Sequence, residues 1–442
     1  MKKILIVAEY FAPNNHIASI RTTKLAKYFK LNGYYIGVVS RKLRANEYVD
    51  PILQKDLKYV DEHIVVSESW LMKKVFQIYN KMRNTNFKKK VTSKTSYNSN
   101  KINLSGLLFS FLKKIFSNSY PFYASKGYSR RAKKQIKRLS HKYDVILTSC
   151  GPFSSNILGS VAKRTNENIL WIADFRDPLI IDFPLKRHLS YYLWIKNEVI
   201  KRVNVITGVS DSCVEIFKDD FKGKIVTIYN GFDENDINNN INVASNEKFS
   251  LTYSGTLYRK SDLSIVFKAI NELIKEAQIN KNNIIVNYLG INSNLFYEQA
   301  EKYDMQGVCH VFGKVDRKKS LQVQSSSHVL LLTSWNNMGN TGMISGKVFE
   351  YMMMNKPIIC SIMGNLSNST LKEMIIKANN GVVWEQANDE IDYPIMKDYI
   401  LKQYKQYENG FPLDFAPNKE YINQYQYSEI TNKFIEIIET QY

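Results

Sequence analysis

One stretch in the second half of the chain combines residue types suited to a phosphorylated, hydroxylated ligand. It runs from Asn340 to Cys360 and reads NTGMISGKVFEYMMMNKPIIC. The pattern predicts a loop, then a helix, then a strand that begins at Pro357. A helix N-terminus presents unpaired N–H groups that favour a diphosphate, and Lys347 adds positive charge. Glu350, about one turn further along, could accept the two hydroxyls of a ribose.

A second basic cluster follows an earlier apolar run, in the sequence YSGTLYRK from Tyr253 to Lys260. Gly255 allows close approach of the backbone to a ligand. Arg259 and Lys260 then place two positive charges where a diphosphate could lie.

The first half of the chain contains two carboxylates and an arginine close together, in the sequence WIADFRDP from Trp171 to Pro178. It follows a predicted strand, and in an open α/β sheet the carboxyl ends of the strands face the ligand. Asp174, Arg176 and Asp177 could therefore bind sugar hydroxyls or an acceptor. They could equally form a structural ion-pair network at the turn, and both interpretations stay open.

The start of the chain has a strand–loop–helix pattern that could bind an anion. The strand Ile4–Ala8 leads into the loop Glu9–His16, where Asn14 and Asn15 occupy positions at which phosphate-binding loops usually carry glycine. Arg21, one turn into the helix, could reach back to a phosphate or could be a solvated surface residue.

Short runs rich in Val and Ile alternate with helical patterns along the whole chain. Continuous apolar strands separated by helices predict parallel sheets covered on both faces, and two successive sets predict two Rossmann-like α/β domains. The predicted strands are Lys3–Glu9, Tyr34–Ser40, His63–Val66, Asp144–Ser149, Ile169–Asp174, Asn204–Val209, Ile225–Tyr229, Ser250–Gly255, Ile284–Gly290, Cys309–Phe312, His328–Thr333, Pro357–Ile362 and Gly381–Trp384.

The predicted domains are 1–235 and 249–418. The polar stretch Asp233–Lys248 has no periodicity and is interpreted as the linker between them. A helical pattern in the tail, 419–442, has no strand left to pair with and could pack back on the first domain.

Composition narrows the class of protein. The 442 residues are 44% hydrophobic, which suits two packed cores. The four cysteines are far apart, without a metal-ligand spacing, and predict buried thiols in a reducing compartment and no metal site. The apolar run at the N-terminus is too short for a secretory signal, and no run approaches a membrane span. We therefore expect a cytoplasmic protein.

Positive charge is concentrated in one segment. Between Leu71 and Ser140 there are 18 Lys or Arg and no Asp or Glu, whereas the rest of the chain is nearly balanced. Within it, Lys81–Asn100 reads as a basic loop, and Leu104–Phe116 has apolar residues at helical spacing. Such a helix could lie on an anionic membrane surface. The alternatives are a core helix with a solvated basic neighbour, or a nucleic-acid site, for which no motif is present.

Four landmarks in order resemble the family 4 glycosyltransferases, which have the GT-B fold. They are DFRDP at Asp174–Pro178, YNGFD at Tyr229–Asp233, YSGT at Tyr253–Thr256, and SGKVFE at Ser345–Glu350 followed by Lys356-Pro357. The first landmark makes the chain most similar to a bacterial subgroup with a DFRDP signature.

The resemblance implies two Rossmann-like domains that face a central cleft. The C-terminal domain would bind a nucleotide sugar, usually a UDP-sugar, and the N-terminal domain would bind the acceptor. Transfer would retain the anomeric configuration and need neither metal nor cofactor, because basic side chains and helix N-termini stabilise the leaving group. Glu350 would hold the ribose, and Lys347 with the amides near Ile344 and Ser345 would meet the diphosphate.

The resulting site assignments are of two kinds. The catalytic candidates are Arg259, Lys260 and Asp177. The donor-binding candidates are Asn15, Gly255, Ile344, Ser345, Lys347 and Glu350.

The chain departs from the family pattern at two positions. Gly342 stands where a second Glu often contacts the donor sugar, and no His follows the strand that ends at Ser149, so that His16 is the nearest candidate. The sequence nevertheless predicts a glycosyltransferase of bacterial surface-polysaccharide assembly, acting on a lipid-linked or saccharide acceptor at the inner face of the cell membrane. The alternatives are a nucleotide-sugar epimerase and a non-catalytic subunit that binds a nucleotide sugar.

Overall fold

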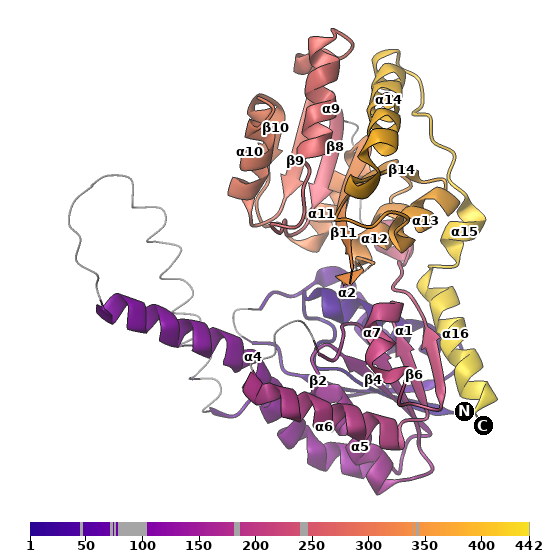
Figure 1. Ribbon diagram of the computed structural model, residues 1–442. Coiled ribbons are helices and arrows are strands. Elements are labelled where there is room, and N and C mark those ends of the chain that lie inside the picture. Colours follow the sequence, from indigo (N-terminus) through magenta and orange to yellow (C-terminus); the bar gives the residue numbers. More distant parts are fainter. Residues whose placement is uncertain are drawn as a thin grey trace. The chain divides into compact units, whose positions relative to one another are not determined.

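The computed structural model describes residues 1–44, 47–70, 74, 77, 104–180, 186–238, 246–338, 340–341 and 344–441. The chain divides into two compact units. The first comprises Met1–Val49, Leu53–Ile228 and Ile435–Tyr442, and the second comprises Asp50–Ile52 and Tyr229–Phe434. Each unit is a Rossmann-like α/β layer structure built on one sheet (Figure 1).

The first unit contains a seven-stranded parallel sheet in the order β3-β2-β1-β4-β5-β6-β7. Its strands are β1 (Lys3–Val7), β2 (Tyr35–Arg41), β3 (Glu62–Val66), β4 (Val145–Cys150), β5 (Leu170–Phe175), β6 (Val205–Gly208) and β7 (Lys224–Thr227). The direction of winding reverses between β1 and β4. In sheets of this type ligands bind at the carboxyl ends of the strands next to such a reversal.

Helices cover this sheet, and their termini place loops at its carboxyl edge. Those between Met1 and Ile228 are α1 (Ile17–Leu31), α2 (Pro51–Lys55), α4 (Leu104–Leu139), α5 (Ser154–Thr165), α6 (Lys186–Arg202) and α7 (Asp211–Val214), with 3-10 turns at Asp56–Tyr59 and Glu215–Phe217. The core centres on Trp171 of β5, whose indole N–H donates to the hydroxyl of Thr148 at 2.9 Å. Gly159 of α5 makes room for this ring, because a Cβ at that position would lie 2.3 Å from it.

The second unit repeats the plan with the order β10-β9-β8-β11-β13-β14, and a short β12 pairs antiparallel with β11. Its strands are β8 (Phe249–Ser254), β9 (Ile284–Leu289), β10 (Cys309–Val311), β11 (Val329–Asn337), β12 (Asn340–Thr341), β13 (Ile358–Met363) and β14 (Gly381–Glu385). Winding reverses between β8 and β11, so the carboxyl ends of these two strands mark the expected ligand edge.

The helices of the second unit complete the layers on its sheet. They are α8 (Asn235–Asn238), α9 (Ser264–Lys275), α10 (Ser293–Glu301), α11 (Arg317–Ser326), α12 (Gly346–Met353), α13 (Thr370–Lys377), α14 (Asp389–Glu408), α15 (Lys419–Asn423) and α16 (Tyr427–Thr440). Its core includes the stacked rings of Tyr288 and Phe296, whose centroids are 4.9 Å apart.

The predicted apolar runs all form strands, with small shifts at their ends. The sequence missed β12, and β11 continues to Asn337, beyond the predicted end at Thr333. The predicted linker begins with structure, since Asp233–Asn238 forms a turn and α8. Its residues 239–245 lie outside the described residues.

The helical pattern of the tail is confirmed as α15 and α16. The last residues of α16 belong to the first unit, where Glu439 forms an ion pair with Lys2 at 2.7 Å and accepts a hydrogen bond from Tyr34 at 2.8 Å.

Leu104–Phe116 is helical as predicted and forms the first part of α4, but its side chains lie outside the described residues. The predicted loop Lys81–Asn100 also lies outside them. Among the described helices, none combines the length and the apolar content that crossing a bilayer requires.

Candidate functional site

The end of β8 and the start of α12 meet at Gly255 in the second unit. Gly255 has φ +125°, a conformation that glycine adopts readily, and a Cβ there would lie 2.1 Å from Cε and 2.3 Å from Nζ of Lys347. The lysine side chain therefore lies directly against the backbone at the carboxyl end of β8. This contact brings together two of the predicted donor-binding residues, which are far apart in sequence.

The ammonium of Lys347 lies in a half-buried position, with the Glu350 carboxylate nearby. Burial lowers the pKa of its ammonium, and the nearby carboxylate of Glu350 opposes that shift. Among the residues that the structure describes, none forms an ion pair or a hydrogen bond with the Lys347 ammonium. A half-buried ammonium without a partner is suited to an anionic ligand.

Two contacts fix α12 beside β8. Ser345 is the N-cap of α12, and its hydroxyl accepts a hydrogen bond from the Lys347 N–H at 3.3 Å. The buried Tyr351 accepts one from the Ser254 N–H at 3.1 Å. Ile344, just before the cap, is buried in the core beneath the helix. The N-terminus of α12 and Lys347 are thus held at the same place, which concentrates positive potential there.

A glutamine that sequence analysis missed orients Glu350. Gln324 of α11 is fully buried, and its side-chain amide donates to Glu350 Oε1 at 2.8 Å and to the Ser320 hydroxyl at 2.9 Å. Glu350 also acts on the charge of Arg317. Burial lowers the pKa of Arg317, but the carboxylates of Asp236 and Glu350 raise it by more, so the net shift of this pKa is upward. The only signal in the sequence was a Ser and a Gln at helical spacing, which many surface helices share.

Arg259 and Lys260 lie on an exposed turn after β8. The Lys260 ammonium is 6.0 Å from the centre of the Trp335 ring, at the end of β11. Both predicted catalytic cations are therefore exposed and lie beyond the carboxyl end of β8.

In the first unit Arg21 has a different environment from both alternatives that the sequence left open. It is buried, and its guanidinium binds both carboxylate oxygens of Asp174 at 2.9 Å and the Ile228 carbonyl at 2.9 Å. Asp174 also accepts a hydrogen bond from Thr207 at 2.8 Å. Arg21 is therefore neither a solvated surface residue nor directed at a phosphate, and Asp174 is structural, because the two charges neutralise each other in the core.

The next residues of the DFRDP sequence gather around the end of β4. The Arg176 guanidinium donates to the Ser149 hydroxyl at 2.8 Å and to the Gly151 carbonyl. Gly151 has φ +119°, and a Cβ there would lie 2.3 Å from Oδ2 of Asp177. Among the described residues, none pairs with the Asp177 carboxylate, which leaves it available to hydroxyl groups.

His16 and Asn15 occupy the loop before α1. The His16 side chain caps α1 by accepting a hydrogen bond from the Ala18 N–H at 3.1 Å, and its ring stacks on Tyr10. Burial lowers the pKa of His16, and Arg176 lowers it further, while Asp177 raises it. The side chain of Asn15 is exposed, and its backbone N–H donates to the Tyr48 carbonyl at 2.9 Å.

A buried acid at the end of β1 was also missed as a site residue. Glu9 is 4% exposed and accepts hydrogen bonds from Ser125 at 2.9 Å and Ser154 at 2.8 Å. Burial raises the pKa of its carboxyl group, against the lowering effect of Arg41 at 3.8 Å. Its position directly after the first strand was the signal that could have identified it.

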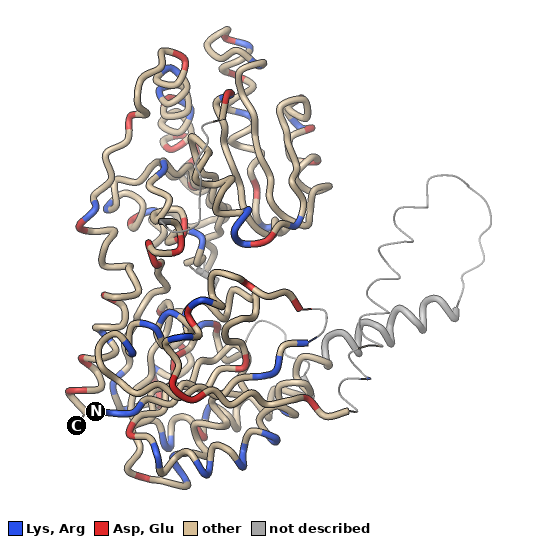
Figure 2. The backbone as a smooth tube through the Cα atoms, turned by 180° about the vertical axis from the view of Figure 1, so that it is seen from behind, with Lys and Arg blue, Asp and Glu red and all other residues tan. Residues whose placement is uncertain are grey.

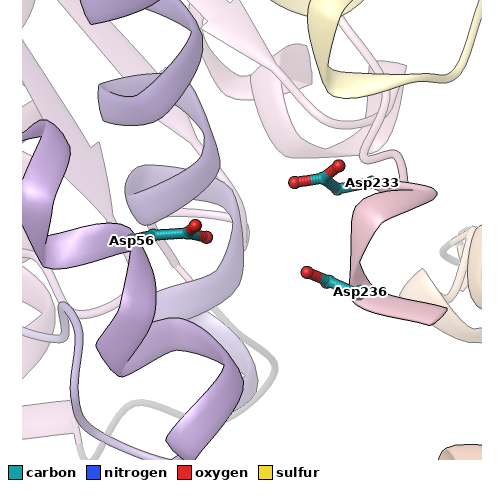
Figure 3. A group of neighbouring side chains, drawn as sticks. All are labelled: Asp56, Asp233 and Asp236. Atoms are coloured by element: carbon teal, nitrogen blue, oxygen red, sulfur yellow. The ribbon is translucent and has the colours of Figure 1, made fainter. Parts of the chain in front are cut away.

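The buried carboxylates in Figure 3 have partners within their own units. Asp56 forms an ion pair with Lys24 at 2.7 Å in the first unit, and Asp236 binds Arg317 at 2.8 Å in the second. Asp233 accepts hydrogen bonds from the backbone and the side chain of Asn235. These pairs explain why the acids are tolerated in buried positions, and we assign them a structural role. Gly342, the other departure from the family pattern, lies outside the described residues.

Comparison with known protein families gives a match within the second unit. Residues 233–401 match the family of glycosyl transferases group 1. The match covers the turn at Asp233, β8, Gly255, α11 and α12, and therefore includes the whole Lys347 site. A search of curated protein sequences finds no significant match.

Solved structures share the fold along nearly the whole chain. A S. aureus TarM mutant in complex with fondaparinux, alpha-GlcNAc-glycerol and UDP is 12% identical, with 99% of each chain covered and a TM-score of 0.55. WaaG, a glycosyltransferase involved in lipopolysaccharide biosynthesis, is 11% identical, with 98% of this chain and 99% of that chain covered and a TM-score of 0.53. A putative UDP-N-acetylglucosamine 2-epimerase from Listeria monocytogenes is 10% identical, with 100% and 97% covered and a TM-score of 0.52. The fold is that of GT-B proteins.

Proposed function

We propose that this chain is a retaining glycosyltransferase that uses a nucleotide sugar, with a UDP-sugar as the expected donor. The observation that carries the proposal is the ammonium of Lys347, which packs on Gly255 at the start of α12 and has no hydrogen-bond or ion-pair partner among the described residues. It lies within the part of the chain that matches glycosyl transferases group 1. In this proposal Lys347 and the amides near Ile344 and Ser345 bind the diphosphate, and Glu350 binds the ribose.

The chemistry proposed for this site is stabilisation of a leaving group. The bond between the sugar C1 and the diphosphate oxygen breaks, the acceptor oxygen takes the place of the diphosphate on the same face, and the acceptor proton goes to the departing phosphate. Lys347 and the α12 N-terminus stabilise the charge that develops on the diphosphate, and Arg259 or Lys260 assists. No metal ion is needed in this scheme.

The acceptor is assigned to the first unit. Asp177, two residues after β5, would accept hydrogen bonds from acceptor hydroxyls, and Asn15 would contribute a contact to the donor. A lipid-linked or saccharide acceptor in bacterial surface-polysaccharide synthesis fits the basic segment 71–140 and the likeness to WaaG. The enzyme would then work at the inner face of the cell membrane.

The test is a thermal-shift panel of UDP-, GDP- and ADP-sugars and the free nucleotides. A ligand that binds the native state raises the melting temperature. We expect one nucleotide class to stabilise the chain and Glu350→Ala to abolish that shift. Absence of any shift would contradict the proposal and favour a non-catalytic subunit.

An epimerase is the second candidate, because the fold is shared with the putative 2-epimerase. The two activities differ in their need for an acceptor. An epimerase converts the nucleotide sugar alone, whereas a transferase consumes it only together with an acceptor, apart from slow hydrolysis. Chromatography of the nucleotide sugar after incubation with the protein alone therefore separates them.

A further inference from the structure

The outward side of α6 carries large apolar residues in the first unit. Leu189, Leu193 and Trp194 are 39%, 44% and 42% exposed, and Leu189 and Leu193 lie one turn apart on the same helix face. On the neighbouring α4, Tyr123 is 50% exposed. We call these four residues the α4/α6 face. Several large apolar side chains exposed on two neighbouring helices can mark a docking surface.

The face is held rigidly by aromatic packing beneath it. Phe122 of α4 stacks on His188 of α6 with ring centroids 3.8 Å apart, and Tyr123 meets the edge of the same histidine at 5.8 Å. Tyr191 stacks on Trp194 at 5.4 Å. The exposed side chains therefore belong to two helices that are locked together.

Basic residues border the face. The Lys126 ammonium lies 4.5 Å from the centre of the Tyr191 ring. Arg130 is exposed one turn further along α4. Its charge lowers the pKa of Tyr191, although burial raises this pKa by more. In Figure 2, Lys and Arg recur along the helices of the first unit. The basic residues in the second half of α4 are Lys126, Arg130, Arg131, Lys133, Lys134, Lys137 and Arg138.

Acidic residues are nearly absent from both helices. The sequence of α4 contains no Asp or Glu, and that of α6 contains only Glu198. Glu198 forms ion pairs with Arg164 and Arg202, so its charge is balanced within the unit. The occupant of the face must therefore be negatively charged and accept Trp, Tyr and Leu side chains.

We propose that the α4/α6 face docks on an anionic lipid bilayer. Trp and Tyr are favoured at the interface between headgroups and acyl chains, and flanking Lys and Arg bind anionic headgroups. The same helix α4 continues from Leu104–Phe116, whose sequence predicts membrane contact, so one element carries both regions. This inference rests on the proposed function, because a lipid-linked acceptor would be presented to the enzyme at the membrane surface.

The experiment is sedimentation of the full chain with vesicles, either of phosphatidylglycerol and phosphatidylcholine in equal parts or of phosphatidylcholine alone. The test variant is Leu189→Ser/Leu193→Ser/Trp194→Ser. The matched control is Ile376→Ser/Ile391→Ser/Ile395→Ser, which removes three apolar side chains of 59%, 61% and 53% exposure from the second unit. All six positions are exposed, so neither variant should disturb folding.

We expect the wild type and the control to bind the anionic vesicles alone, and the test variant to bind them about tenfold more weakly. Lys126→Gln/Arg130→Gln should weaken binding less, and only at low salt, because screening weakens its electrostatic part. The proposal is overturned if the test variant binds like the control, or if the wild type ignores anionic vesicles. It is also overturned if the test variant only abolishes a dimer seen by size-exclusion chromatography, which would identify a second copy as the occupant.

Nucleotide binding keeps this outcome separate from the proposed function. Thermal shift with the nucleotide-sugar panel is measured on the wild type, the test variant and the control. If the chain binds vesicles as expected but binds no nucleotide, the docking surface is supported and the proposed glycosyltransferase function is refuted. If the chain binds a nucleotide but no vesicles, the docking surface is refuted and the proposed function is unaffected.

Discussion

In each unit a glycine follows one of the two strands between which the winding reverses, and the side chains packed on these two glycines have opposite charge. Gly151 follows β4 and Gly255 follows β8, and both have φ values in the region that glycine favours. A Cβ on Gly151 would lie 2.3 Å from the Asp177 carboxylate, and one on Gly255 would lie 2.3 Å from the Lys347 ammonium. In each case the carboxyl end of a parallel strand holds a charged group without a partner among the described residues.

The difference shows how one fold provides two kinds of site. A carboxylate at the strand end suits hydroxyl groups, and an ammonium beside a helix N-terminus suits a diphosphate. The neighbouring charges also differ. In the first unit Arg21 and Asp174 neutralise each other in the core, whereas in the second unit Gln324, a neutral donor, orients the acid nearest to Lys347.

The largest effect should come from breaking the buried pair in the first unit. Asp174→Ala leaves the Arg21 guanidinium buried and uncompensated, which should lower the free energy of unfolding by about 3 to 5 kcal/mol. Urea titration measures this free energy of unfolding. Asp220→Ala is the control, because Asp220 is 55% exposed in its pair with Lys196, and it should cost less than about 1 kcal/mol. Equal effects of the two changes would contradict a structural role for Asp174.

The second-largest effect should come from removing the positive charge of Lys347 in the second unit. Lys347→Met keeps most of the side-chain volume but removes the ammonium, and should lower kcat about 100- to 1000-fold, as loss of one transition-state donor does. The melting temperature should not fall, because a poorly solvated charge is removed. Lys319→Met, at an exposed position of α11, should leave kcat unchanged. A Lys347→Met enzyme with normal kcat would refute the assignment.

A smaller effect is expected at the residue that orients Glu350. Gln324→Leu removes a hydrogen bond to a carboxylate, worth about 1.5 to 3 kcal/mol, and should raise KM for the donor about ten- to 100-fold with a smaller change in kcat. Gln324→Glu should be worse, since it places two carboxylates together. Gln322→Leu on the same helix is the control for helix stability. An unchanged KM, measured by initial rates, would limit Gln324 to packing.

The smallest effect concerns pH. Burial lowers the pKa of Lys347, so its ammonium loses its proton at a lower pH than that of an exposed lysine. If Lys347 binds the diphosphate as proposed, the protonated form is the one that binds, so kcat/KM should be maximal below this pKa and fall to about half where pH equals it. Lys347→Arg should shift the decline to higher pH. An identical alkaline limb in both proteins would assign the decline to another group.

Local sequence was sufficient to predict most of the helices and strands. The runs of Val and Ile predicted every strand except β12, because burial on both faces of a parallel sheet requires an apolar side chain at nearly every position. Two-residue β12 is too short to produce a pattern. The helix before the strand that begins at Pro357 was likewise predicted, and the structure adds that Ser345 is its N-cap.

Tertiary structure alone decided which charged groups are available. Arg21 and Asp174 are 153 residues apart, and only the folded chain brings the side chain of Arg21 in α1 against that of Asp174 in β5 and withdraws both from ligand binding. The same holds for Gln324 and Glu350, and for Lys347 beside Gly255. The sequence by itself determined which residues could carry charge and where strands would end. Whether a charge is neutralised depends on distances of a few ångströms between segments that approach one another only in the folded chain.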